Sequence, residues 1–296
     1  MTPDDLAAEF TQLNGVMPLG DPAGQKLVFR CVLPGGAPGV LKLVRLPSVG
    51  SEDDEAELNE LVARMRRDIE ILASIDSPYV ARVLEPEMGV RECIIDDTTY
   101  AYYFEVLIDG ESVAQVLANG VLPPAEVVRL GLNVTSAIGE FWSCDAVHRD
   151  VKPANVMRES ASGRYVLLDA GYALDLTGPS LTRVAGIPGT LPYLAPERLD
   201  LARKRQLDFR SDLYSLGVVM YEAVVGSHPY IVAGMTQEAQ LQAIANTAAT
   251  QPSIIPQGLD RLWPVVLRLL EKRPHARYKS CQSLSDALAQ CTQEAS

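Results

Sequence analysis

The pattern of apolar, proline and glycine residues changes sharply along the chain, and this change constrains the fold most. Residues 16–44 carry valine, leucine and phenylalanine in short runs, interrupted by closely spaced proline and glycine residues. This pattern is typical of short strands joined by tight turns, and we expect strands at residues 27–33 and 40–44. Residues 122–142 are typical of a long amphipathic helix, and residues from about 230 to 291 are typical of helices separated by proline-bearing loops. The sequence therefore predicts an α+β fold with a strand-rich first part and a larger helical part.

One short stretch carries most of the chemistry. Residues 148–156 read His-Arg-Asp-Val-Lys-Pro-Ala-Asn-Val, which places an acid, Asp150, beside Lys152 and an amide, Asn155. Alone, such a string could arise by chance in a loop. Its meaning depends on what stands on either side of it.

The stretch resembles the catalytic loop H-R-D-x-K-P-x-N of eukaryotic-type (Hanks-type) serine/threonine protein kinases. The resemblance implies that Asp150 accepts the proton of a substrate hydroxyl. It also implies that Lys152 neutralises charge on the moving phosphoryl group and that Asn155 holds a magnesium ion. A lysine at this place is typical of the serine/threonine branch of the family.

A strand expected at residues 164–168 ends in Asp169-Ala170-Gly171, which resembles the family's D-F-G with alanine for phenylalanine. The resemblance implies that Asp169 ligates magnesium. In the family, the phenylalanine ring reports active and inactive states. With Ala170 in its place, we expect no switch based on a phenylalanine flip.

Residues 189–197 read Gly-Thr-Leu-Pro-Tyr-Leu-Ala-Pro-Glu and closely resemble the G-T-x-x-Y-x-A-P-E that closes the family's substrate-binding loop. The resemblance implies that Thr190 forms a hydrogen bond near the catalytic aspartate and lysine. It makes Glu197 a buried carboxylate, which needs a charged partner, and Arg277 stands where the family keeps that partner. Residues 211–217 resemble S-D-x-[WY]-S-L-G, whose aspartate, here Asp212, braces the backbone of the catalytic loop.

Lys42 is a lone charge inside an apolar run. It resembles the lysine of the family's V-A-I-K strand, which holds the nucleotide phosphates, although an edge-strand lysine facing water is the plainer alternative. The helix expected at residues 55–74 should supply its carboxylate partner. In the family, this acid stands ten residues before the proline that follows the helix. Counting back from Pro78 therefore selects Asp68, whose side chain is one methylene shorter than the usual glutamate. Glu70 lies about 200° further round the helix and should face elsewhere.

Two regions depart from the family pattern. Gly20 and Gly24 resemble the first and third glycines of the phosphate-covering loop, but Pro22 replaces the middle glycine and has no N–H to offer a phosphate. A plain hairpin turn explains this segment nearly as well. Further on, counting from Gly110 puts Glu105 at a buried position that is normally apolar. A count from the usual glutamate adds one residue to the inter-lobe hinge instead, and both registers stay open.

The resemblance covers roughly residues 16–290 and implies a bilobal protein-kinase-like fold. We expect an N-terminal arm or short polar helix at residues 1–14, a small β-rich lobe with one control helix at residues 15–107, and a larger α-helical lobe at residues 108–296. The implied cofactors are ATP and Mg²⁺, and the implied substrate is a protein serine or threonine. A pseudokinase acting as a nucleotide-binding scaffold and a kinase of a non-protein hydroxyl are the alternatives.

Arg149, directly before the catalytic aspartate, suggests control by phosphorylation of the activation loop, with the phosphate captured by arginine. Thr182, eight residues before Thr190, is the first candidate phosphosite. Thr177 and Ser180 follow it, and an ordinary exposed loop threonine is the alternative. A regulatory protein is a possible further partner.

The composition limits the classes of protein and the cellular compartments that fit this sequence. The 296 residues carry a formal net charge of −12, which argues against a nucleic-acid binder. The five cysteines include no C-x-x-C pair and are odd in number, so neither a zinc site nor a disulfide framework is expected. The first residues lack the pattern of a signal peptide, and no apolar run is long enough for a membrane segment. We therefore expect a cytoplasmic protein.

Overall fold

The computed structural model describes residues 3–19, 26–48, 50–85, 87, 89–168, 191–199, 208–251 and 259–292. The chain divides into two compact units. Unit 1 comprises Met1–Asp76 and Ala81–Ile108, and unit 2 comprises Ser77–Val80 and Asp109–Ser296. Within the described ranges, no helix is both long and apolar enough to cross a membrane.

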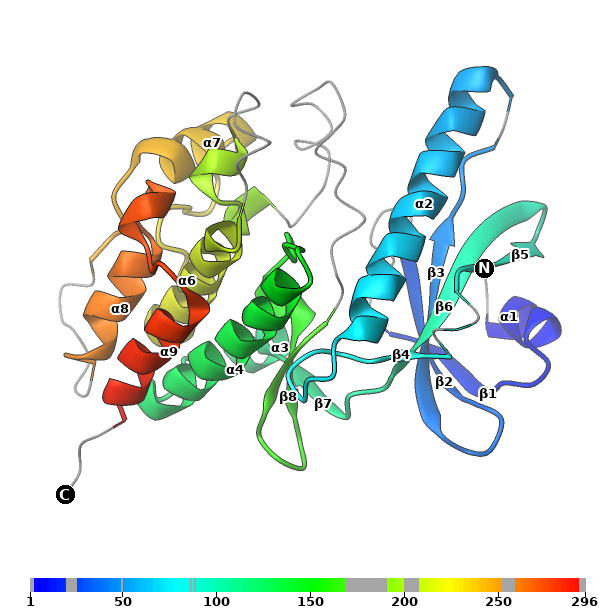
Figure 1. The fold of residues 1–296 in the computed structure, drawn as a ribbon, viewed down its shortest axis with the longest axis horizontal. Coiled ribbons are helices and arrows are strands. Elements are labelled where there is room, and N and C mark those ends of the chain that lie inside the picture. Colours follow the sequence, from blue (N-terminus) through cyan, green and yellow to red (C-terminus); the bar gives the residue numbers. More distant parts are fainter. Residues whose placement is uncertain are drawn as a thin grey trace. The chain divides into compact units, whose positions relative to one another are not determined.

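An antiparallel sheet forms the body of unit 1 (Figure 1). Its strands are β1 (Asn14–Pro18), β2 (Lys26–Val32), β3 (Pro38–Arg45), β4 (Val83–Leu84), β5 (Arg91–Ile95) and β6 (Thr98–Val106). They run in the order β1-β2-β3-β6-β4, and β5 also pairs with β6. The strands expected at residues 27–33 and 40–44 are thus β2 and β3, and β3 lies inside the sheet between β2 and β6.

Helix α1 (Pro3–Glu9) and the residues that follow it belong to the core of unit 1. Leu6 and Phe10 are buried together with Leu41, Leu43 and Phe104 of the strands. The ring of Phe10 meets that of Tyr102 edge to face, with centroids 4.9 Å apart. Aromatic pairs in this geometry add to the free energy gained by burial alone. The segment expected as a polar helix or arm therefore has an apolar side that completes one face of the sheet.

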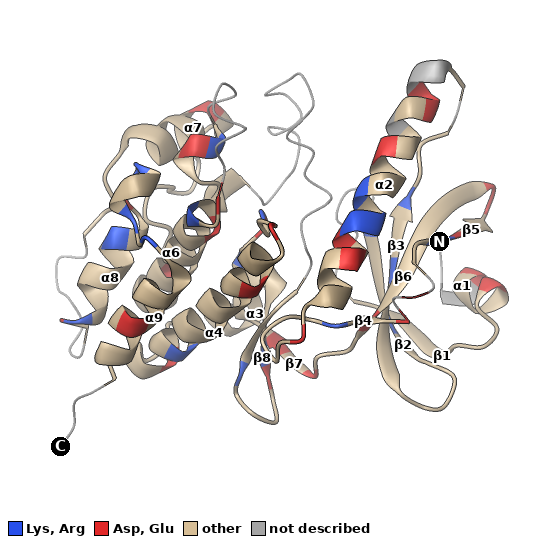
Figure 2. Cartoon of the chain, in the orientation of Figure 1, with Lys and Arg blue, Asp and Glu red and all other residues tan. Residues whose placement is uncertain are grey.

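Helix α2 (Glu52–Ser74) begins where Ser51 accepts a hydrogen bond from the Asp54 amide. A serine before acidic residues is a favourable helix start, because its hydroxyl and the carboxylates satisfy the free N–H groups of the first turn. One stripe of the helix, spaced three and four residues apart, is buried: Val62, Met65, Ile69 and Leu72. The rest of α2 carries both acidic and basic side chains (Figure 2).

Unit 2 is mainly helical. Its elements are β7 (Gly110–Ser112), α3 (Val113–Ala118), α4 (Pro124–Ser143), β8 (Val156–Glu159), β9 (Tyr165–Leu167), α6 (Arg210–Val225), α7 (Gln237–Asn246), α8 (Leu262–Leu269) and α9 (Cys281–Gln290). Helix α6 is buried along nearly its whole length and packs against α4 and α8. A Cβ on Gly217 of α6 would lie 2.6 Å from Cβ of Leu269, so this close helix contact requires glycine.

The sequence at residues 109–112 predicts a helix start, but helix α3 begins later, at Val113. Residues 110–112 form β7 instead, and they pair with β8. Ser112 and Gln115 then form a capping box that fixes the helix start. The position of the helix is therefore set by a strand pairing with residues nearly fifty positions away, which local sequence does not reveal.

The segment Leu191–Leu194 is fastened to the helical core by three side chains. His228 Nε2 donates to the Pro192 carbonyl at 2.8 Å, and Ser215 donates to the Tyr193 carbonyl at 2.7 Å. The Tyr193 hydroxyl donates to Glu222 at 2.7 Å. His228 Nδ1 accepts from the backbone N–H groups of Tyr230 and Ile231, so the imidazole is neutral in this arrangement. Burial, with the nearby Lys272 charge, lowers the pKa of His228 to about 4.

We expect His228 to make the protein's stability depend on pH below neutrality. Its folded pKa lies below the unfolded value of about 6.5, so the unfolded chain binds the proton first and stability falls as pH drops from about 6.5 to about 4. Relative to His228→Gln, the wild type should lose up to about 1.4 kcal/mol per pH unit in this window. Denaturant unfolding at several pH values measures both slopes, and parallel slopes would contradict the assignment.

Candidate active site

The residues of the catalytic-loop motif converge on Asp150. They lie between the end of α4 and the start of β8, in a loop with a short 3₁₀ turn at Pro153–Asn155. Lys152 Nζ lies 2.8 Å from Asp150 Oδ2, and Asn155 Nδ2 donates to the same oxygen at 2.7 Å. Asn155 Nδ2 also donates to the Asp150 carbonyl at 2.9 Å. The structure therefore brings together three of the predicted site residues.

The other carboxylate oxygen of Asp150 is differently placed. Asp150 Oδ1 is buried and has no hydrogen-bond partner in the part of the chain that the structure describes. A buried carboxylate oxygen without a donor is costly unless another group completes it. A substrate hydroxyl is a donor of the right kind, so Oδ1 fits the role of proton acceptor.

The backbone at Arg149 is held in an unfavourable conformation. Its φ is +71°, in the left-handed region that residues with side chains seldom adopt. Asp212 of α6 accepts the His148 amide at 2.7 Å and the Arg149 amide at 2.8 Å, as the motif predicts. Arg198 Nη1 donates to the Arg149 carbonyl at 2.5 Å. These three bonds fix the backbone directly before Asp150, where such strain is typical of functional sites.

His148 links the catalytic loop to the end of β9. Its imidazole is 1% exposed, and Nε2 donates to the Leu168 carbonyl at 2.9 Å. Leu168 in turn donates its amide to the Asn155 carbonyl at 2.8 Å. Leu168 directly precedes Asp169, so the two predicted magnesium ligands belong to segments joined by hydrogen bonds.

The fit to magnesium rests on donor chemistry. With its Nδ2 committed to Asp150, Asn155 offers its carbonyl oxygen, the kind of ligand that Mg²⁺ accepts. Among the described residues, no group of three or more His, Cys, Asp or Glu side chains is placed to hold a metal ion. Asp169, Thr190, Gly20 and Gly24 lie outside the described residues, so their predicted roles stay predictions.

Glu197 and Arg277 form the buried pair that the motifs predict. Arg277 donates to the two carboxylate oxygens at 2.6 and 2.8 Å, and its side chain is fully buried. Ser211 also donates to Glu197 at 2.8 Å. Burial alone would raise the pKa of Glu197, but the hydrogen bonds and charge of Arg277 hold it below its ordinary value. Arg277 further donates to the backbone carbonyls of Arg210, Glu271 and Lys272, so the pair fixes the end of the Leu191–Arg198 region.

In unit 1, Lys42 is not an edge lysine facing water. It points to the opposite face of β3 from Leu41 and Leu43, and its Nζ lies 2.5 Å from Glu105 Oε2. Both side chains are 3% exposed. The burial of Glu105 in β6 agrees with the register counted from Gly110.

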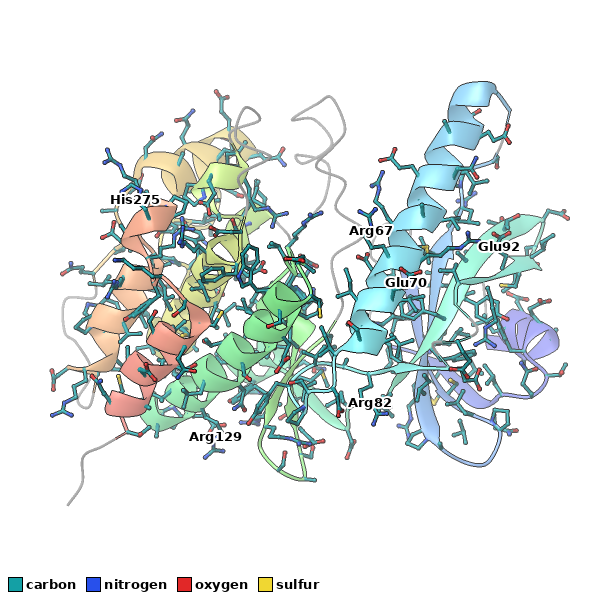
Figure 3. The ribbon with its side chains drawn as sticks, in the orientation of Figure 1. Arg67, Glu70, Arg82, Glu92, Arg129 and His275 are labelled. Carbon is teal, nitrogen blue, oxygen red and sulfur yellow. The ribbon has the colours of Figure 1, made fainter. Side chains whose placement is uncertain are left out.

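The acids of α2 lie as the helical period predicts. Asp68 is half-buried and Glu70 is exposed; Figure 3 labels Glu70 and its neighbour Arg67 on this helix. The pairing of Asp68 with Lys42 stays a prediction.

Two contacts in the site were not predicted from the sequence. Glu105 pairs with Lys42, and Arg198 donates to the Arg149 carbonyl. Each carries a signal in the sequence. Glu105 is the only charge in the apolar run at residues 100–107, and Arg198 directly follows the glutamate that ends the motif at residues 189–197. Neither signal names a partner, because the partner depends on strand register or on packing against α6.

Comparisons with known proteins agree with the site. A family model described as protein kinase domain matches residues 28–289. The probable serine/threonine-protein kinase SCO3848 of Streptomyces coelicolor is 31% identical over 238 residues, which are 77% of this chain and 33% of that protein. The serine/threonine-protein kinase PknE of Mycobacterium tuberculosis is 34% identical over 226 residues, 76% of this chain and 37% of that protein.

The chain thus spans about a third of the length of these curated relatives. A crystal structure of a point mutant of the PknI kinase domain from Mycobacterium tuberculosis matches with a TM-score of 0.65 and 26% identity, covering 95% of each chain. The mixed fold, with its strand-rich first part and helical second part, is therefore the predicted one. The chain belongs to the eukaryotic-type (Hanks-type) serine/threonine protein kinase family.

Proposed function

We propose that this chain is an ATP-dependent kinase that transfers the γ-phosphate to serine and threonine hydroxyls of proteins. The observation that carries the proposal is the state of Asp150. One carboxylate oxygen is held by Lys152 and Asn155, and the other is buried without a donor among the described residues. Phosphoryl transfer depends mainly on positioning and charge neutralisation, and this arrangement supplies an oriented acceptor beside a cation.

The proposed cofactors are ATP and Mg²⁺. In this proposal Lys42 contacts the nucleotide phosphates, and Asn155 and Asp169 hold the metal. When bound, the metal neutralises charge on the phosphate oxygens. The residues of the chain then have three tasks: Lys152 faces the transferred group, Asp150 orients and accepts the hydroxyl proton, and the Asp212 carboxylate keeps the loop in place.

A nucleotide-binding scaffold is the second candidate. The departures from the family pattern at Pro22, Asp68 and Ala170 favour it to some degree. A kinase of a non-protein hydroxyl is the third, but the Glu197–Arg277 pair supports the protein-kinase reading. It secures the segment that resembles the family's substrate-binding loop.

Regulation by phosphorylation of the activation loop is part of the proposal. Arg149 is the candidate phosphate ligand, and Thr182 is the first candidate site, ahead of Thr177 and Ser180. A cytoplasmic signalling role is proposed as well, with a regulatory protein as a further partner. The five cysteines support this setting, because none of them forms a disulfide bond, as expected in a reducing compartment.

Replacing Asp150 should separate an enzyme from a scaffold. With Mg²⁺, ATP and a generic basic protein, the wild type should label serine or threonine. Asp150→Asn should lower kcat by about 10²- to 10⁴-fold, because it removes the proton acceptor. Phosphate-transfer rates and phosphoamino-acid analysis measure this, and equal thermal unfolding of both proteins shows that the fold is kept. A wild type that binds nucleotide but transfers no phosphate would favour the scaffold.

Thr182 should carry phosphate in the active protein. Phosphopeptide mapping of freshly assayed enzyme tests this, and Thr182→Ala should lower kcat by about tenfold or more because the phosphate no longer binds Arg149. Thr177→Ala and Ser180→Ala are the matched controls in the same loop. Active enzyme in which Thr182 is unmodified would rule the site out.

Arg198 should act on catalysis through the Arg149 carbonyl. Arg198→Leu removes this hydrogen bond and should lower kcat by about tenfold, while the KM for ATP stays within about threefold. Arg198→Lys, which keeps a charged donor, should recover part of the loss. A purely structural role would instead lower the unfolding temperature of both variants without this split between kcat and KM.

A further inference from the structure

A charge partner of Lys42 lies on a strand. In the family, the corresponding lysine pairs with an acid on the control helix, so that helix placement governs the site. Here Lys42 on β3 pairs with Glu105 on β6, and both belong to one sheet. We propose that Glu105 is the residue that positions Lys42 for the nucleotide phosphates, from within the sheet. The inference rests on the proposed function, which assigns Lys42 to the phosphates.

Strand register places the two side chains together. In the β3–β6 pairing, Val40 stands opposite Glu105 and Lys42 stands opposite Tyr103. Because side chains alternate between faces, Lys42 and Glu105 share the face that carries Val40 and Tyr103. They are diagonal neighbours, a separation that two long side chains can close. The aromatic cluster around Phe104 occupies the opposite face.

Burial makes this pairing energetically important. Each side chain is only 3% exposed, so each charge has lost nearly all of its water. A buried charge of this kind is stable only with a close partner of opposite sign. The ring of Tyr103 adds a weaker attraction, with Nζ 5.8 Å from its centroid.

The ammonium group can serve two partners at once. It has three N–H donors, and Glu105 Oε2 takes one of them at 2.5 Å. A carboxylate on one side restricts the rotation of the long lysine side chain. The carboxylate thereby fixes the position of the ammonium group, which is what a phosphate ligand needs.

The two strands form a rigid support for the pair. β3 and β6 are in register over seven residue pairs, from Gly39 opposite Val106 to Arg45 opposite Tyr100. A helix that rests on a sheet through side chains can shift by small sliding motions, whereas two hydrogen-bonded strands keep their register. The pairing of β3 with β6 therefore keeps Lys42 and Glu105 within reach of each other.

The test compares ADP with adenosine, which lacks phosphates. Titration calorimetry in the presence of Mg²⁺ gives both Kd values. The ratio of the adenosine Kd to the ADP Kd isolates the phosphate contribution, because this ratio is higher when the phosphates bind more strongly. Glu105→Gln should lower this ratio by about tenfold or more, the size expected for a charge-assisted hydrogen bond. The fall in this ratio caused by Asp68→Asn should be at least threefold smaller than the fall caused by Glu105→Gln. Glu70→Gln, an exposed carboxylate on α2, is the matched surface control, and adenosine binding should stay within threefold in every variant.

Opposite outcomes are clear. A ratio that falls as much in Asp68→Asn as in Glu105→Gln overturns the inference, because the helix acid would then position the lysine. Lys42→Met separates this from the proposed function. If its ratio equals that of the wild type, Lys42 does not bind phosphate, and both the assignment and the inference fail. If its ratio falls while that of Glu105→Gln does not, the inference alone fails.

Thermal unfolding identifies a variant that does not fold. Should Glu105→Gln be such a case, Glu105→Asp keeps the charge with a shorter reach. Its ratio should then lie between those of the wild type and Lys42→Met. A Glu105→Asp ratio equal to the wild type, together with an Asp68→Asn ratio as low as that of Lys42→Met, overturns the inference.

Discussion

One buried carboxylate holds the catalytic machinery in place. Asp212 is 1% exposed within the core helix α6, and it accepts the amides of His148 and Arg149. Burial raises its pKa, while the nearby His148 and Arg198 charges and these amides oppose that shift. The left-handed backbone at Arg149 depends on these bonds, and the orientation of Asp150 depends on that backbone. The site's geometry is thus set by the centre of the helical unit and not by the surface loop itself.

Both units use buried pairs of opposite charge at the points where function demands a fixed side chain. Glu197 and Arg277 secure the Leu191–Arg198 region, and Lys42 and Glu105 fix a lysine inside the sheet. Such pairs add little net stability, since removing water from two charges costs about as much as their attraction returns. Loss of one partner, however, leaves an uncompensated buried charge at a cost of about 3–5 kcal/mol. Pairs of this kind therefore specify one arrangement of the chain strongly.

Residues inside long motifs could be predicted well. The role of Asp212 in holding the loop and the pairing of Glu197 with Arg277 could be predicted from the sequence, because Asp212 and Glu197 lie in motifs whose order and spacing are distinctive. The start of α3, the core position of Phe10 and the partnership of Glu105 were not. Each depends on a contact between segments distant in sequence, as when β7 pairs with β8 or β3 pairs with β6. A short apolar pattern such as that of α1 also carries too few residues to reveal which surface it will cover.

The packing of α1 has a consequence for how the chain reaches its structure during synthesis. Phe10 leaves the ribosome before its partners Tyr102 and Phe104, which follow about ninety residues later. Contacts so far apart in sequence form slowly, because a long loop must close first. Until β6 is made, the apolar side of α1 stays uncovered and open to wrong partners. Helix α1 is made before the strands that cover it and is among the last pieces of its unit to find its place, so a nascent chain would need protection over that interval.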